Sequence, residues 1–152
     1  MVFPAPRHVI INIIPFGSPQ YEAMKQFREA ILRRPIGLTL RDVDVQDEQD
    51  QTHIAAFDDQ GSLIGTLVLK PLSASRVRLR QMAVSPLLQR SGIGTTMVRF
   101  AENHAKESGF TLIELHARRY AQGFYEKLGY RTSGDYFSEV TLPTIKMVKR
   151  LS

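Results

Sequence analysis

The 152-residue chain contains no cysteine. This absence excludes a disulfide framework, thiolate zinc ligands and a cysteine nucleophile. The chain also lacks an apolar run long enough to cross a bilayer. Three of its four histidines, His8, His53 and His104, show no spacing typical of metal ligands, so we expect no metal site.

The sequence also lacks a long basic run, although it is basic overall. It holds 20 basic and 15 acidic residues, for a formal net charge of +5. Because the basic residues are scattered, we expect no nucleic-acid partner. Most of them are arginines, which bind phosphate and carboxylate groups well, so a small polyanionic ligand suits the charge.

The length suits a single domain over residues 1–152. The first 16 residues lack the charged start of a secretory signal and are interrupted by prolines. We therefore expect a cytoplasmic protein with no membrane partner, and we leave a homodimer open.

Hydrophobic periodicity and turn residues predict the order β-α-β-β-β-α-β-α-β-β. This order indicates a mixed α/β sheet with helices on its faces. The segment 41–51 is acidic and is interpreted as a loop. The expected elements are a strand at 8–14, a helix from 19 to about 34, a hairpin at 52–70, a strand at 76–84, a helix at 92–109, a strand at 111–117, a short helix at 121–129, and strands at 130–137 and 144–150.

The strand at 76–84 changes its apolar phase. Val77 and Leu79 are odd-numbered apolar positions, whereas Met82 and Val84 are even-numbered. Side chains alternate strictly between the two faces of a strand, so the switch requires an extra residue. We predict a β-bulge at about Arg80 to Met82, where unpaired backbone groups could bind a ligand.

Two glycines follow this strand in the segment Gln89-Arg90-Ser91-Gly92-Ile93-Gly94. A glycine-rich turn at a helix start directs N–H groups into one concavity, and the helix dipole adds positive potential there. A Walker loop fails because Thr95 and Thr96 stand where lysine and Ser/Thr are needed. A dinucleotide fingerprint matches weakly, because Met97 replaces its third glycine. A plain tight turn without a ligand remains an alternative.

The flanking segments resemble those of the GNAT-type N-acetyltransferase superfamily. The family's phosphate loop, Gln/Arg-x-x-Gly-x-Gly/Ala, is similar to residues 89–94, and its "FYEKLGF" segment resembles Phe124 to Tyr130. The likeness is strong from about 76 to 131 and weak in the N-terminal half. The chain looks most like a small bacterial branch of uncharacterised acetyltransferases.

This resemblance implies a mostly antiparallel mixed sheet with a bulged, splayed central strand and helices on both faces, and it implies acetyl-CoA as co-substrate. The pantetheine is then expected along the backbone of Met82, Ala83 and Val84. The diphosphate is expected on the N–H groups of residues 89–94, which are Gln89, Arg90, Ser91, Gly92, Ile93 and Gly94. The family often places an asparagine before the short helix; this chain has none, and Gln122 or backbone is the expected substitute.

The implied reaction is direct acyl transfer from a thioester to a primary amine, in a small molecule or a peptide. Such a transfer needs a base for the amine, a donor to the carbonyl and a proton for the thiolate. The Val84 N–H is the expected carbonyl donor. The resemblance places Tyr125 as general acid; the alternative is a core aromatic.

The base is less defined by the sequence. Glu114 and His116 share one face of their strand, and imidazole has a suitable protonation range. We consider His116 as the base, against the alternatives of a structural role for either residue and of water as the base.

Acceptor specificity is expected from the first helix, the loop after it and the hairpin, with Arg28, Arg80 and His53 as candidates to bind a substrate carboxylate. Two other functions stay open: an acyl-CoA-binding sensor without turnover, and a basic nucleic-acid-binding module.

Overall fold

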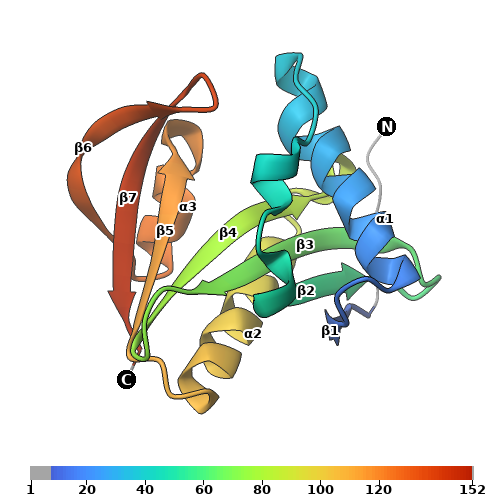
Figure 1. The fold of residues 1–152 in the computed structure, drawn as a ribbon, viewed down its shortest axis with the longest axis horizontal. Coiled ribbons are helices and arrows are strands. Elements are labelled where there is room, and N and C mark those ends of the chain that lie inside the picture. The colour runs from blue at the N-terminus through green and yellow to red at the C-terminus, as the bar shows by residue number, and fades with distance from the viewer. Residues whose placement is uncertain (1–7, 152) are drawn as a thin grey trace.

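A computed structural model describes residues 8–151 as a mixed α/β fold around a seven-stranded sheet (Figure 1). The strand order is β1-β2-β3-β4-β5-β7-β6, and neighbours are antiparallel except for the parallel pair β4–β5. The predicted fold class and element order are confirmed. The strands are β1 (Ile10–Ile14), β2 (Thr52–Phe57), β3 (Leu63–Pro71), β4 (Arg76–Val84), β5 (Leu112–Arg118), β6 (Arg131–Glu139) and β7 (Leu142–Arg150).

Residues 1–7, which form part of the N-terminal segment considered above for a secretory signal, lie outside the described residues. Within residues 8–151, no helix is both long enough and apolar enough to span a membrane.

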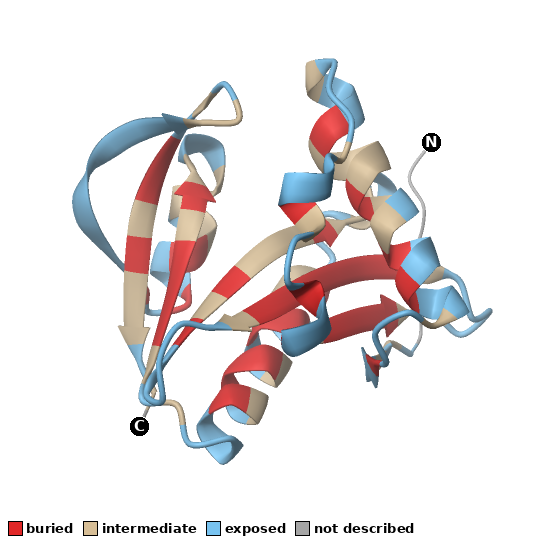
Figure 2. Ribbon diagram, in the orientation of Figure 1, coloured by how far each residue is buried: buried red, intermediate tan, exposed pale blue. Residues whose placement is uncertain are grey.

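The α-helices lie on both faces of the sheet, and strand β2 shows why. The helices are α1 (Pro19–Arg28), α2 (Ile93–Glu107) and α3 (Gln122–Lys127). Ala55 packs with Met24 of α1, whereas its neighbours Ile54 and Ala56 belong to the cluster that contains Met97 of α2. Successive side chains of a strand point to opposite faces, so α1 and α2 cover opposite sides. Figure 2 shows β2 and β3 almost wholly buried between these layers.

Helix α1 begins as predicted, because Ser18 accepts a hydrogen bond from the Tyr21 N–H and Pro19 is at the first helical position. The prediction of a regular α-helix to about Arg34 is wrong, because the regular α-helix ends at Arg28. After Arg28 the chain forms a π-helical turn, η1 (Glu29–Arg33), and then a 3-10 turn, η2 (Arg34–Ile36). Proline in the last turn explains the change, because its ring blocks regular α-helical winding one turn earlier.

The acidic segment predicted as a loop holds two 3-10 turns, η3 (Asp42–Val45) and η4 (Glu48–Asp50). The segment is not simply solvated, because Glu48 is fully buried. Ion pairs with Arg28 and Arg80 compensate the buried charge of Glu48.

The predicted β-bulge is present in β4. Thr66 of β3 pairs with Ala83, and Val68 pairs with Arg80, so β4 has one residue more than its partner over this interval. Gln81 takes a left-handed backbone conformation with φ of 56°. The extra residue accounts for the change from the odd-numbered apolar positions Val77 and Leu79 to the even-numbered positions Met82 and Val84.

Strands β4 and β5 separate just before the bulge. Their parallel ladder ends at the pair Leu79 and Leu115, although β5 continues to Arg118 against β7. Figure 1 shows the two ribbons diverging from their common end near the bottom of the view. The predicted splay is confirmed, and from Arg80 onward the β5-facing edge of β4 has no ladder partner among residues 8–151.

Candidate active site

A cavity of about 890 Å³ opens where β4 and β5 separate. One wall comes from η1, η2 and η3, the opposite wall from β5 and the β6–β7 turn, and the remaining sides from β4, the glycine loop and α3. This arrangement brings the helix-turn segment near the N-terminus together with strands from the C-terminal half.

Nine of the residues predicted for the site line this cavity. They are Arg80, Met82, Val84, Gln89, Arg90, Gly92, Gly94, His116 and Tyr125. Four others are adjacent to it in the sequence without lining it: Ala83, Ser91, Ile93 and Gln122. Ala83 and Ile93 have core positions, and both are buried.

The glycine loop is built by two left-handed residues before α2. Arg90 has φ of 69°, and Gly92 caps α2 with φ of 87°. A Cβ atom at Gly92 would have no heavy atom within 4 Å, so open space lies over this end of the helix. Gly94 has a different environment, because its Cβ would lie 3.2 Å from Phe124 Cζ. Close packing of α2 against α3 therefore explains Gly94, independently of any phosphate.

Tyr125 lies on α3 and faces the cavity from a nearly buried position, with 6% of its surface exposed. Among residues 8–151, its hydroxyl donates no hydrogen bond, while its ring packs edge-on against Phe124 and Tyr130. Burial raises the pKa of the Tyr125 phenol, and the nearby Tyr120 adds to this effect. The hydroxyl is therefore protonated throughout the neutral range and free to donate.

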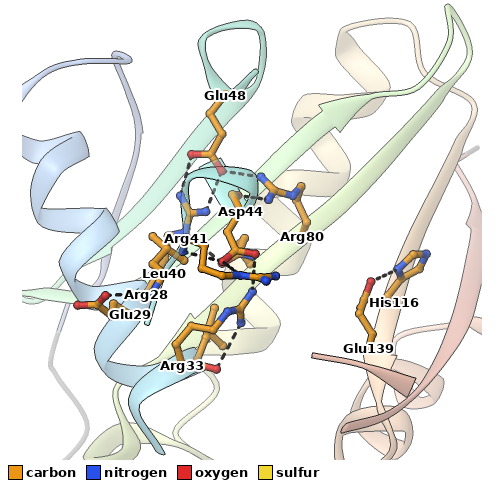
Figure 3. A network of polar contacts seen from close by, with 12 residues as sticks. Arg28, Glu29, Arg33, Leu40, Arg41, Asp44, Glu48, Arg80, His116 and Glu139 are labelled. Carbon is orange, nitrogen blue, oxygen red and sulfur yellow. Dashed lines mark hydrogen bonds and ion pairs between the residues drawn. The ribbon is translucent and has the colours of Figure 1, made fainter. Parts of the chain in front are cut away.

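His116 lies on β5 and is held by a residue that the sequence reasoning missed. Its Nδ1 is 3.0 Å from Glu139 Oε1 (Figure 3). Phe137 packs edge-on against the imidazole ring. The hydrogen bond from His116 lowers the pKa of the Glu139 carboxyl, so it is ionised at neutral pH. Glu139 comes from the end of β6, 23 residues away, and no local pattern marks it.

Glu114, the other candidate base on this face, is outside the cavity lining. It is almost completely buried and is engaged by Arg76, Arg78 and Lys146, at 3.3, 2.9 and 3.7 Å. Burial alone would raise the pKa of Glu114, but its arginine partners lower it. A buried carboxylate with three cationic partners and a lowered pKa is a poor proton acceptor, so Glu114 has a structural role.

Two of the three residues expected to bind acceptor lie elsewhere. Arg28 is fully buried and donates to Glu48 through Nη1 at 2.9 Å and Nη2 at 2.7 Å. His53 is buried, with Nε2 2.7 Å from the carbonyl oxygen of Glu48. Neither lines the cavity, so the expectation for Arg28 and His53 is corrected: both are committed to Glu48.

Arg80 lines the cavity, but its donors are also engaged. Nη1 lies 2.6 Å from Glu48 Oε2, and Nη2 lies 2.5 Å from the carbonyl oxygen of Asp44. Figure 3 shows Arg28 and Arg80 converging on Glu48, with the His116–Glu139 pair on the other side of the opening. Arg28 Nε also reaches Gln81 Oε1 at 3.3 Å, so this network is connected to the bulge.

The Gln122 side chain does not face the cavity, where a substitute for the missing asparagine is expected. Its side-chain oxygen accepts a hydrogen bond from the Tyr136 hydroxyl on β6, and it is not part of the cavity lining. The segment before α3 therefore offers the ligand its backbone and the exposed Tyr120.

Comparison with known proteins identifies a family and several relatives that match this chain. The model of the "Acetyltransferase (GNAT) family" matches residues 19–130. A Bacillus subtilis (strain 168) protein assigned as an acetyltransferase is 33% identical over 101 residues, covering 66% of this chain and 67% of that protein. The matches to three further curated relatives span 41% to 60% of their lengths.

Solved structures agree in fold. An N-acetyltransferase assigned in Lactobacillus plantarum has a TM-score of 0.83 and 27% identity, covering 95% of this chain and 99% of that one. An aminoglycoside 6'-N-acetyltransferase in complex with coenzyme A has a TM-score of 0.76 and 20% identity, covering 94% of this chain and 97% of that one, and shows the fold alone. From the match over residues 19–130, the chain belongs to the acetyltransferase (GNAT) family and is an acyltransferase.

Proposed function

We propose that the chain transfers an acetyl group from acetyl-CoA directly to a primary amine bound in the same cavity. The observation that carries this proposal is the opening between β4 and β5, where a bulged edge, a glycine loop and two proton-exchanging side chains line one cavity.

The residues of this opening fit an acyl-CoA. The β4 edge from Met82 to Val84 has no β5 partner, so its backbone groups are available to an extended pantetheine, as in strand addition. The left-handed turn at Arg90 and Gly92 ends at the N-terminus of α2, which favours a diphosphate through its N–H groups and dipole. When bound, acetyl-CoA supplies an activated acyl carbon and a thiolate leaving group.

Tyr125 is the proposed proton donor. Transfer forms a bond from the amine nitrogen to the acyl carbon and breaks the carbon–sulfur bond, so a proton must reach sulfur. The Tyr125 hydroxyl is protonated, lines the cavity and has no competing acceptor among residues 8–151. The Val84 N–H is the proposed donor to the carbonyl oxygen.

His116 is the proposed proton acceptor for the amine. If Nδ1–H donates to the ionised Glu139, then Nε2 carries the lone pair that accepts a proton. Glu139 is then a positioning residue that fixes the tautomer of His116. Arg80 is proposed to shape the acceptor side of the wall rather than to bind acceptor, because its Nη1 and Nη2 already have partners.

The experiment that tests this function is a screen of primary amines with acetyl-CoA, followed by release of free thiol. The chain has no cysteine, so a thiol reagent reports CoA without background from the protein. Turnover with any acceptor excludes a silent acyl-CoA sensor. Binding of acetyl-CoA without turnover across the screen supports the sensor, and absence of acetyl-CoA binding overturns both proposals.

A further inference from the structure

Arg33 is a buried cation whose donors are poorly satisfied. It is 4% exposed, and its Nε has no hydrogen-bond partner among the described residues. Its other contacts are long: Nη1 lies 3.4 Å from the Leu32 carbonyl oxygen, and Nη2 lies 3.4 Å from Asp44 Oδ1. Arg28, buried equally deeply, instead has two contacts below 3 Å to Glu48. A buried guanidinium held only by such long contacts is poorly compensated, so a ligand oxygen that reaches its Nη1 or Nη2 would be favoured.

The π-helical turn η1 places Arg33 in the cavity wall. A π-helical turn contains one residue more than an α-helical turn. Single π-turns within helices occur often at functional sites. Arg33 lines the cavity, while the next arginine, Arg34, is 66% exposed at its side chain and pairs with Glu29. The two adjacent arginines therefore differ in environment: Arg33 is a cavity residue and Arg34 is a surface residue.

The surroundings of Arg33 combine apolar surface with positive charge. The same wall contains apolar side chains from η1, η2 and η3, namely Ile31, Leu32, Pro35, Ile36 and Val43. The charged residues that line the cavity are five arginines, Arg33, Arg78, Arg80, Arg90 and Arg118, and two acids, Asp44 and Glu139. Arg78 and Arg80 are already paired with Glu114 and Glu48, at 2.9 and 2.6 Å. Arg33, beside the apolar wall, has only the 3.4 Å ion pair with Asp44, so its charge is less well compensated and can attract a negative group of the acceptor.

We propose that Arg33 binds a carboxylate of the acceptor, so that the acceptor class is an amino carboxylate with an apolar segment between its amine and its acid group. Arginine N–H groups present a planar fork that matches a carboxylate. The amine would then be near His116 and Tyr125, and the apolar segment would lie on the wall formed by η1 and η2. This inference rests on the proposed function and adds the substrate class.

The test compares amino carboxylates of increasing chain length with the corresponding carboxamides, using CoA release to obtain kcat/KM. Wild type is expected to prefer the carboxylate by ~10-fold or more, from a hydrogen bond to a charged group. Arg33→Gln keeps a polar side chain but removes the charge. It should lower kcat/KM for the carboxylate by ~10–100-fold and leave the carboxamide nearly unchanged. Arg34→Gln is the matched control and should behave as wild type.

Equal use of carboxylate and carboxamide by wild type overturns the inference, as does an equal loss of both substrates in a folded Arg33→Gln variant. If Arg33→Gln does not fold, the wild-type preference alone decides. If no amine turns over, calorimetry with the amino carboxylates in the presence of CoA decides: tighter binding of carboxylate than of carboxamide supports the Arg33 site even though the proposed reaction has failed. No difference in affinity rejects it.

Discussion

The Tyr125 hydroxyl is the single group whose removal most directly tests the proposed proton donor. Tyr125→Phe keeps the ring that packs against Phe124 and Tyr130 and removes one oxygen. We expect kcat to fall by ~10²-fold or more, with little change in KM for acetyl-CoA, because the proton is needed only as the thiolate leaves. Steady-state kinetics with a saturating amine measures this. A variant with wild-type kcat would assign Tyr125 to the core alone.

Glu139 acts through His116 in the proposed mechanism, and this indirect role has its own signature. Glu139→Gln should lower kcat by ~10-fold while leaving KM for acetyl-CoA unchanged, because an uncharged partner orients the imidazole less firmly. In a His116→Ala background the same change should have no further effect, since neighbours that act as a unit are not additive. Asp135→Asn, an exposed position on the same strand, is the control. Additive effects in the double variant would contradict the positioning role.

The sequence predicts individual site residues well where the signal is local. Gly92, Met82 and Tyr125 come from short motifs, and all three line the cavity. Glu139 and Arg33 were missed for physical reasons. Glu139 meets His116 only after β6 and β7 have formed, and Arg33 is distinguished from Arg34 only by its burial in the folded chain. Neither event leaves a periodic pattern in the chain.

Among the secondary-structure elements, the short turn η4 is held to the sheet by Glu48. Burial alone would raise the pKa of this carboxyl, but hydrogen bonds and charge from Arg28, with Tyr21 and Arg80, lower it to about 2 from 4.5. A folded-state pKa below the unfolded value gives stability that is fully present above about pH 4.5 and lost as the pH falls toward 2. The shift corresponds to about 3 kcal/mol.

Glu48→Gln should therefore reduce the free energy of unfolding at pH 7 by ~3–5 kcal/mol, because Arg28 would be left buried with a neutral partner. The deficit should shrink between pH 5 and pH 2, where wild type loses its own advantage. Denaturant unfolding across this pH range measures both effects. Glu22→Gln removes a surface pair with Lys25 and should change stability by less than ~1 kcal/mol. A deficit for Glu48→Gln that is independent of pH would contradict this account.

The β-bulge and the Glu48 network differ in how far the sequence reveals them. The bulge was predictable because the alternation of Val77, Leu79, Met82 and Val84 is a local pattern. The network was not, because its partners Arg28 and Arg80 lie 20 and 32 residues from Glu48. An acidic segment is usually solvated, so only the packed structure identifies Glu48 as its fully buried member.

For the molecule as a whole, donor and acceptor occupy different parts of one cavity in this account. The donor end is the glycine loop before α2 together with the β4 edge, and the acceptor end is formed by η1 and η2. The helix-turn segment that carries Arg33 contacts β4, so the acceptor wall is anchored to the strand that seats the donor. The family motifs cover the donor end, which explains why the sequence predicted that end better than the acceptor end.

The central claim is that the glycine loop seats the diphosphate of acetyl-CoA, and a charge placed at Gly92 tests it most directly. Asn and Asp both tolerate the left-handed backbone there, and the position has open space, so Gly92→Asn and Gly92→Asp have matched shapes and differ by one charge. Calorimetry with acetyl-CoA on the two folded variants is the measurement. We predict that Gly92→Asp binds at least ~10-fold more weakly than Gly92→Asn, with a gap that narrows as salt is added. Equal affinity of the two variants would contradict the seat of the donor, and with it the proposed reaction in this cavity.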